Sequence, residues 1–196
     1  MPYDNKMKAI CFIGARGGSK GVPRKNIREF AGKPLIAHTI KSALDSNIFS
    51  DVIVSTEDKE IAKIAKKYGA SVPFMRPQNL ATDNAGMDKV IFHAIKKLRK
   101  LGYQFDILVN RDCTVPFIRN QDIKGTIDLL KSSKSDAVYG VYQQHHNPYF
   151  NMMESNSKGF LKMSKSIGER VKSRQTAPVV YQLNGLFTIN VDRLVK

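Results

Sequence analysis

Two hydrophobic patterns alternate along most of the chain. Short runs rich in β-branched residues predict buried strands at 9–13, 52–56, 70–74, 106–110, 137–142 and 179–189. Between them, apolar residues that recur every three or four positions predict amphipathic helices over 34–44, 58–68, 87–101 and 120–130. Asp58 is typical of a helix start, and Gly69 of a helix end. Strands that alternate with such helices form βαβ units, so we expect a three-layer α/β/α fold with a mostly parallel sheet.

The alternation stops after the strand at 137–142. Residues 143–178 are polar, basic and aromatic, with no helical period and only weak β signals. Strand character resumes at 179, and residues 190–195 predict the start of another helix. We interpret 1–196 as a single domain in which about 143–178 form an extension that covers the functional site or meets a partner subunit.

Charge narrows the choice of ligand. The 196 residues include 32 Lys and Arg against 17 Asp and Glu, a net charge of +15, which favours polyanionic partners. Nucleic acid is not the expected partner, because no aromatic residues interleave with the lysines to stack bases. Most of these lysines are expected on solvated helix faces, as at positions 63, 66, 67, 96, 97 and 100.

Composition also bears on the cellular compartment. No apolar run approaches the ~20 residues that a membrane span needs, and the first residues do not resemble a signal peptide. Cys11 and Cys113 both fall near predicted strands and are expected to be buried free thiols rather than a disulfide. We therefore expect a cytoplasmic protein with no membrane partner.

A glycine-rich, cationic loop follows the first predicted strand. It runs from Gly14 to Asn26 and carries Arg16, Lys20, Arg24 and Lys25. Glycines allow the backbone to turn sharply and bring its N–H groups close to a ligand, and the cations suit a polyphosphate. The loop matches neither G-x-x-x-x-G-K-[ST] nor G-x-G-x-x-G. Its position after a strand is where open α/β sheets hold their ligands, and the alternative is a flexible surface loop.

Three further groups of residues carry candidate chemistry. Arg76-Pro77, followed by 80–83, offers a guanidinium near the sheet edge that either clamps a phosphate or is structural. Asp112 follows a buried strand and either holds a divalent cation, forms a turn, or pairs with Arg111. The third group offers a guanidinium, amides and a phenol suited to a polyhydroxylated acid: Arg174, Gln175, Tyr181 and Asn184. His145 and His146 adjoin it, with no third ligand that would make a metal site.

These residues together resemble a known family. The segment 15–26 followed by 32–35 strongly resembles the acylneuraminate cytidylyltransferases, the CMP–sialic acid synthetase family. The match continues in order through most of the chain, at Ser55-Thr56, Arg76-Pro77, Leu80-Ala81, Asp83, Pro116, Asp122-Ile123, Arg174-Gln175, Pro178, Tyr181 and Asn184-Gly185. The resemblance implies a Rossmann-like sheet of the nucleotide-diphospho-sugar transferase type with a small extension.

The resemblance also implies a reaction and a set of roles. CTP and a nonulosonic acid of sialic, legionaminic or pseudaminic type would give the CMP-sugar and pyrophosphate, aided by Mg²⁺, in a homodimer. Catalytic roles fall on Arg16, Lys20 and Lys25. Nucleotide binding falls on these three and on Ala15, Gly17, Ser19, Asn26, Arg76, Ala81 and Asp83. Sugar binding falls on Asn110, Arg174, Gln175, Tyr181 and Asn184, and Asp112 is the candidate metal ligand.

The chain departs from the family pattern in two places. Sialic acid members read like Q-P-T-S-P-L-R after the strand at 106–110, whereas this chain reads N-R-D-C-T-V-P-F-I-R, with an aspartate as in the related KDO enzymes. The family's Asp-x-Asp metal pair near the C-terminus has no match before Lys196. Either the chain is truncated, or Asp112 and a bound nucleotide suffice. The alternatives are therefore a KDO-type or other sugar nucleotidyltransferase, or a nucleotide-binding protein without turnover. The stretch 147–152 favours a bacterial nonulosonate.

Overall fold

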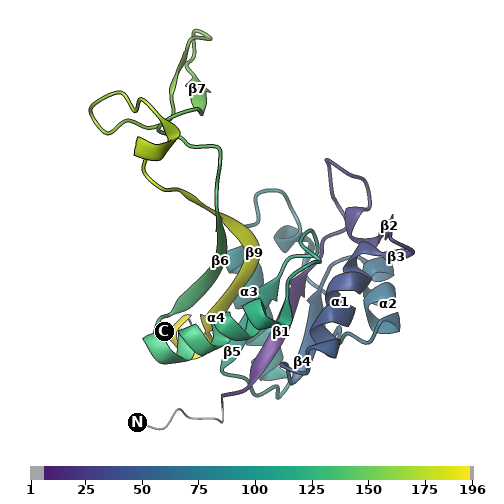
Figure 1. The fold of residues 1–196 in the computed structure, drawn as a ribbon. Helices are drawn as coiled ribbons and strands as arrows, with labels where there is room; N and C mark the ends of the chain where they lie inside the picture. Colours follow the sequence, from purple (N-terminus) through teal and green to yellow (C-terminus); the bar gives the residue numbers. More distant parts are fainter. Residues whose placement is uncertain (1–6, 195–196) are drawn as a thin grey trace. The chain divides into compact units, whose positions relative to one another are not determined.

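The computed structural model describes residues 7–194 (Figure 1). They form two compact units. The first comprises the described residues of 1–140 and 185–196, and the second comprises 141–184. A hairpin of β7 (Met153–Ser155) and β8 (Leu161–Met163) lies in the second unit, together with the 3-10 turn η3 (Arg174–Thr176). The weak β signals of the sequence thus correspond to one short hairpin.

A five-stranded sheet organises the first unit. Its strand order is β4-β1-β5-β9-β6, with β1 parallel to both β4 and β5, and β9 antiparallel to β5. The carboxyl ends of β4, β1 and β5 therefore meet at one edge of the sheet. The strands are β1 (Ala9–Gly14), β4 (Asp51–Ser55), β5 (Ile107–Arg111), β6 (Ala137–Gln143) and β9 (Tyr181–Asn190).

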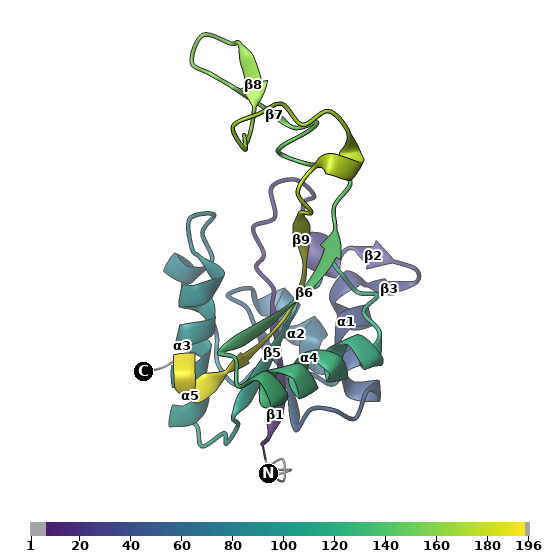
Figure 2. The same cartoon turned by 60° about the vertical axis from the view of Figure 1, so that its left-hand side comes forward.

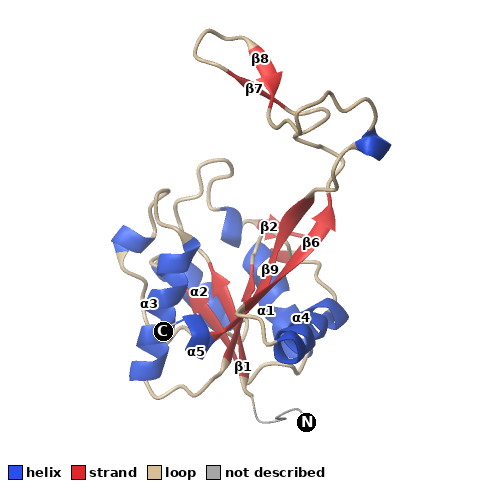
Figure 3. Ribbon diagram, turned by 90° about the vertical axis from the view of Figure 1, so that its left-hand side faces the viewer, coloured by secondary structure: helices blue, strands red, loops and turns tan. Residues whose placement is uncertain are grey.

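Helices cover both faces of this sheet (Figure 3), which confirms the predicted three-layer α/β/α fold. They are α1 (Leu35–Asp45), α2 (Lys59–Lys67), α3 (Met87–Lys100), α4 (Asn120–Ser133) and the short α5 (Val191–Leu194). Smaller elements join them: η1 (Lys25–Ile27), η2 (Gln78–Leu80) and a hairpin of β2 (Glu29–Phe30) and β3 (Lys33–Pro34). Within residues 7–194, no helix has both the length and the apolar character that a membrane crossing would require.

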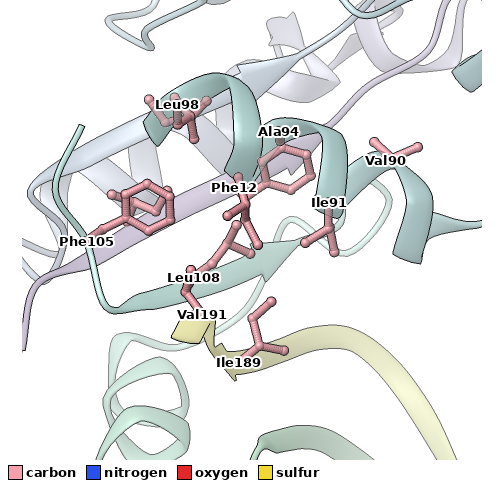
Figure 4. Packing of buried hydrophobic residues seen from close by; sticks show 12 residues of the cluster. Phe12, Val90, Ile91, Ala94, Leu98, Phe105, Leu108, Ile189 and Val191 are labelled. Carbon is pink, nitrogen blue, oxygen red and sulfur yellow. The ribbon is translucent and has the colours of Figure 1, made fainter. Parts of the chain in front are cut away.

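One face of the sheet is buried by α3. Phe12 of β1 and Leu108 of β5 pack against the apolar stripe of the helix, which includes Ile91, Ala94 and Leu98 (Figure 4). The opposite face uses the alternate strand positions. Residues of α1 and α2 pack there with β1 and β4, and residues of α4 pack with β5, so that α3 and α4 lie on opposite sides (Figure 2). Successive side chains of a strand point to opposite faces of the sheet, so each strand contributes to two separate hydrophobic layers.

Local sequence signals set the ends of α2. The Asp58 carboxylate accepts hydrogen bonds from the backbone N–H groups of Glu60 and Ile61, both at 2.9 Å, and so satisfies two donors of the first turn. Gly69, at φ +93°, adopts the left-handed conformation that ends the helix. The predicted helix start and end are both confirmed.

The predicted strand at 70–74 is wrong. Only Ser71 bridges to Ile53, through its N–H to the Val52 carbonyl at 2.8 Å and its carbonyl to the Val54 N–H at 2.9 Å. Pro73 follows two residues later and has no N–H to donate, so the ladder cannot continue. Ala70 is nevertheless buried in the core, and Val72 and Phe74 are partly buried against it.

Truncation of the α3 stripe tests this packing. Leu98→Ala should lower the free energy of unfolding by about 2–5 kcal/mol, because it removes a fully buried side chain and leaves a cavity. Urea unfolding measures the change. Leu129→Ala, the same substitution at a position 53% exposed on α4, should stay within about 0.5 kcal/mol of the parent. Equal losses at the two positions would contradict the assignment of the core.

Candidate functional site

A cavity of about 500 Å³ lies at the carboxyl edge of the sheet. Four segments form it: the glycine-rich loop after β1, residues 76–85 after β4, the start of α3, and the loop after β5. The parallel pairing of β4, β1 and β5 explains why segments so far apart in the chain converge here.

Most of the predicted nucleotide-binding side chains line this cavity. They are Arg16, Ser19, Lys20, Lys25, Asn26, Arg76 and Asp83, and the candidate metal ligand Asp112 joins them. The predicted loop also contributes Gly14, Gly21 and Val22, and the predicted segment 80–83 contributes Leu80 and Thr82, although none of these was given a role of its own. Sequence reasoning missed Ala85, Met87, Val90 and Thr114. Thr114 could have been found by the argument that selected Asp112, since both follow β5. No sequence pattern pointed to Val90 as a cavity residue. Its position in the helical repeat predicts a core residue, and it does pack in the core as well.

Other predicted residues lie elsewhere. Ala15 is buried, and its N–H donates to the Ser55 carbonyl at 3.0 Å. The Ala81 N–H donates to the Gln78 carbonyl at 2.9 Å within a turn. Asn110 is buried in β5, with its amide nitrogen 3.3 Å from the Gly185 carbonyl. The remaining sugar candidates belong to the second unit: Arg174 and Gln175 in η3, Tyr181 and Asn184 in β9.

Carboxylates already hold two cations of the loop. Asp83 pairs with Arg16 at 2.9 Å, Nη1 to Oδ1, and also with the ammonium of Lys20. The hydrogen bond from Lys20, together with the charge of Arg16, lowers the pKa of Asp83, so this carboxyl group stays ionised. Without a ligand, Asp83 therefore occupies donors that a phosphate would use.

The other side of the loop is fastened to the start of α2. Arg24 pairs with Asp58 and Glu60, and its hydrogen bond to Asp58 holds the pKa of that carboxyl group below its usual range. The Gly17 N–H donates to Glu57 Oε1 at 2.6 Å. A side chain at Gly17 would not fit, because a Cβ there would lie 2.5 Å from Asp58 Oδ2. The loop is thus packed directly on the carboxylate that caps α2.

Lys25 differs from the other cations of the loop. It lines the cavity and forms no ion pair with any described residue. The neighbouring Asn26 is buried, and its amide donates to the Arg16 carbonyl at 2.9 Å, which fixes the shape of the loop. Lys25 is therefore the cation of this loop that remains available to a ligand without breaking an existing pair.

Arg76 is buried beneath the cavity. Its Nε donates to Ser55 Oγ at 3.1 Å, and its Nη2 donates to the Ser55 carbonyl. Burial lowers the pKa of this arginine. Arg76 is thus anchored to the end of β4 and presents positive charge to the cavity that it lines.

Asp112 forms a turn, and it does not pair with Arg111. Its Oδ1 accepts from the Thr114 N–H at 2.9 Å, whereas Arg111 donates to Ser42 Oγ at 3.1 Å. The described residues contain no cluster of three metal-ligating side chains. Since Mg²⁺ in phosphate sites commonly uses one or two carboxylates together with substrate phosphates, Asp112 fits as a single ligand alongside a nucleotide and not as part of a preformed centre.

Fold and cavity together define an α/β protein with a cationic, polyphosphate-sized site at the carboxyl edge of its sheet. Residues 10–188 match the family model described as cytidylyltransferase, and the chain belongs to this family.

Known proteins of this kind are similar along much of the chain. The pseudaminic acid cytidylyltransferase of Campylobacter jejuni is 46% identical over 135 residues, which cover 69% of this chain and 58% of that protein. The CMP-N,N'-diacetyllegionaminic acid synthase of Legionella pneumophila is 39% identical, over 67% of this chain and 57% of the relative. The chain thus spans less than two thirds of the length of these curated relatives.

A solved structure shares the fold. CMP:2-keto-3-deoxy-manno-octonic acid synthetase complexed with CTP matches with a TM-score of 0.70 and 19% identity, over 96% of this chain and 76% of that one.

The pairing of Asp83 predicts competition with phosphate. Asp83→Asn should strengthen binding of inorganic tripolyphosphate, because the ligand no longer has to displace a carboxylate from Arg16 and Lys20. The gain should be only about twofold to fivefold, since exposed ion pairs contribute little free energy. Isothermal titration at constant ionic strength measures this affinity. Asp128→Asn removes the same charge from the exposed face of α4 and should leave the affinity unchanged. Weaker binding by the Asp83 variant would instead assign this carboxyl group to ligand binding.

Proposed function

We propose that this protein joins CMP from CTP to a nonulosonic acid and releases pyrophosphate. The observation that carries the proposal is the cavity itself, in which Arg16, Lys20 and Lys25 converge within a chain of the cytidylyltransferase family. A hydroxyl oxygen of the sugar attacks the α-phosphorus of CTP and loses its proton. The bond between the α-phosphorus and the bridging oxygen breaks, and that oxygen leaves with pyrophosphate.

The roles of the three cations follow from charge. Negative charge grows on the leaving pyrophosphate and on the non-bridging α-phosphate oxygens, and fixed cations stabilise it without reorganising. In this proposal the triphosphate takes Arg16 and Lys20 from Asp83, while the unpaired Lys25 contacts phosphate directly. Arg76 adds charge from beneath the cavity and is held in place by Ser55.

We propose that Mg²⁺ enters with the triphosphate. Asp112 supplies one carboxylate at the cavity, and its second oxygen has no hydrogen-bond partner among the described residues. Asp112 would hold the metal at the cavity, and the metal, when bound, would supply positive charge that offsets part of the charge of the phosphates. The protein contributes the position of Asp112, which is fixed by its own N–H, 3.1 Å from the Gly185 carbonyl.

The sugar is proposed to be an acidic nine-carbon sugar of pseudaminic or legionaminic type, as named for the two curated relatives. Arg174, Gln175, Tyr181 and Asn184 of the second unit suit its carboxylate and hydroxyl groups. Within the first unit, Asn110 is proposed as a separate contact for the sugar, since its buried Oδ1 has no partner among the described residues. Because CTP is made in the cytoplasm, we place the reaction there.

Turnover tests the proposal directly. Mixing the protein with CTP, Mg²⁺ and pseudaminic, legionaminic or sialic acid should release pyrophosphate, which a coupled phosphatase assay detects. KDO serves as the alternative substrate. Binding of CTP without turnover is the alternative outcome of the same assay. CTP binding without pyrophosphate from any of these sugars would reject the proposed reaction.

Lys25 tests the mechanism. Lys25→Ala should lower kcat by about 10²–10³-fold, since it removes a fixed positive charge at the reacting phosphates. Its far-ultraviolet circular dichroism should not change. Lys63→Ala, on the exposed face of α2, removes an equal charge and should leave kcat unaltered. A Lys25 variant with full kcat would exclude this side chain from the chemistry.

The second unit suggests an assembly. Within residues 141–184, all of which the structure describes, Asn147 is the one buried residue, and no hydrophobic side chain is buried. Apolar side chains are exposed along this unit, among them Phe160 at 70% and Leu161 at 66%. Because a unit with so few buried side chains and many exposed apolar ones gains stability by packing against a partner, we propose that it packs against a second copy of the chain in a homodimer.

Sedimentation velocity tests the homodimer. The parent protein should sediment as a dimer, and Leu161→Lys should shift it toward monomer by placing a charge in an apolar interface. Leu129→Lys, at an exposed position of the first unit, should remain dimeric. A monomeric parent protein, or a dimer indifferent to Leu161→Lys, would contradict the proposed interface.

A further inference from the structure

Arg111 carries a positive charge inside the protein without a carboxylate to balance it. Its side chain is fully buried in β5. Nη1 donates to Ser42 Oγ at 3.1 Å, Nη2 lies 3.5 Å from the Pro116 carbonyl oxygen, and Nε has no partner among the described residues. None of these acceptors is charged, and burying an unpaired charge is costly.

The neighbouring titratable groups do not supply the missing negative charge. Cys11 and Cys113 are the groups whose charge would act on Arg111. Burial raises the pKa of Cys11 to about 12 and also raises the pKa of Cys113, so both thiols are neutral near pH 7. Asp112 is next in the chain, but its carboxylate accepts from the Thr114 N–H.

A pocket of about 300 Å³ lies between α1 and the loop after β5. Arg111 does not line it, but both of its acceptors, Ser42 and Pro116, do, so the buried guanidinium lies one hydrogen bond behind the lining of the pocket. Lys33 and Lys41 line it from outside. One carboxylate is present as well: Asp45 lies 3.8 Å from the Lys41 ammonium, a loose and exposed pair.

We propose that this pocket binds a phosphate-type oxyanion. Lys33 and Lys41 supply direct cationic contacts, with Lys41 released from Asp45. Ser42 relays the charge of Arg111, because its oxygen accepts from Nη1 and its hydroxyl proton is therefore directed elsewhere, toward the anion. The pocket shares no lining residue with the cavity at the glycine-rich loop, so this is a second anion site.

The two sites border the same loop. Asp112 and Thr114 line the larger cavity, and residues 116–118 line this pocket. An anion over Ser42 would therefore fix the segment that places Asp112. The inference itself rests on Arg111 and its surroundings, and it holds whether or not the protein turns over CTP.

The test uses inorganic phosphate and a background that lacks the three cations of the loop that line the larger cavity. In Arg16→Ala/Lys20→Ala/Lys25→Ala protein, phosphate should still bind by isothermal titration and raise Tm, with chloride holding the ionic strength constant. Adding Lys33→Ala/Lys41→Ala should weaken that affinity at least about tenfold, since two charge-assisted contacts are lost. Adding Lys63→Ala/Lys67→Ala, an equal change of charge on the exposed face of α2, should not.

Arg111→Met provides a second readout. In the same background, removing the buried charge should abolish the dependence of Tm on phosphate concentration while the protein stays folded without phosphate. If that variant does not fold, the two lysine pairs decide the question alone. Absence of phosphate binding in the background protein overturns the proposal. So does equal weakening by both lysine pairs, which would indicate nonspecific attraction to a basic surface.

Discussion

The parallel pairing of β1 with β4 and β5 is the constraint on which the site depends. It aligns Gly14 with Ser55 and places the loop after β5 at the same edge. Two side-chain and backbone contacts extend this alignment past the strand ends: the Ala15 N–H bonds to Ser55, and Arg76 holds the same residue through its side chain. Ser55 is thus the point at which the glycine-rich loop and the segment 76–85 are registered to each other.

Carboxylates then set the state of the loop. Asp58 and Glu60 hold Arg24, Glu57 accepts from the Gly17 N–H, and Asp83 holds Arg16 and Lys20 from the opposite side. Arg24 adopts a left-handed backbone conformation at φ 55°, which is unusual for a residue other than glycine. Its ion pairs with Asp58 and Glu60 hold it in this conformation. The contacts with Asp58, Glu60 and Glu57 therefore fix the backbone of the loop, whereas the pairs with Asp83 are the ones that a phosphate would displace.

Much of this arrangement could be predicted from the chain alone. Hydrophobic period located the strands and helices, and the rule that ligands sit at the carboxyl edge selected Arg16, Lys20 and Asp112 together. Hydrophobic periodicity did not identify Val90 as a cavity residue, because this side chain packs in the core and also lines the cavity. It also failed at 70–74, where Pro73 interrupts a ladder that β-branched residues suggest. The burial of Arg111 could not have been predicted, because arginine is mostly exposed and no sequence pattern marks the exception.

Gly17 links the glycine-rich loop to the start of α2, two segments that are far apart in the sequence. Its missing Cβ leaves the space that the Asp58 carboxylate occupies, and that carboxylate also caps α2 and holds Arg24. Substitutions at 17, 24 and 58 would therefore not have independent effects, since each changes the same few atoms. A coupled change at two of these positions should therefore be tolerated where either change alone is not, because the packing, the helix cap and the ion pair all meet at the same carboxylate.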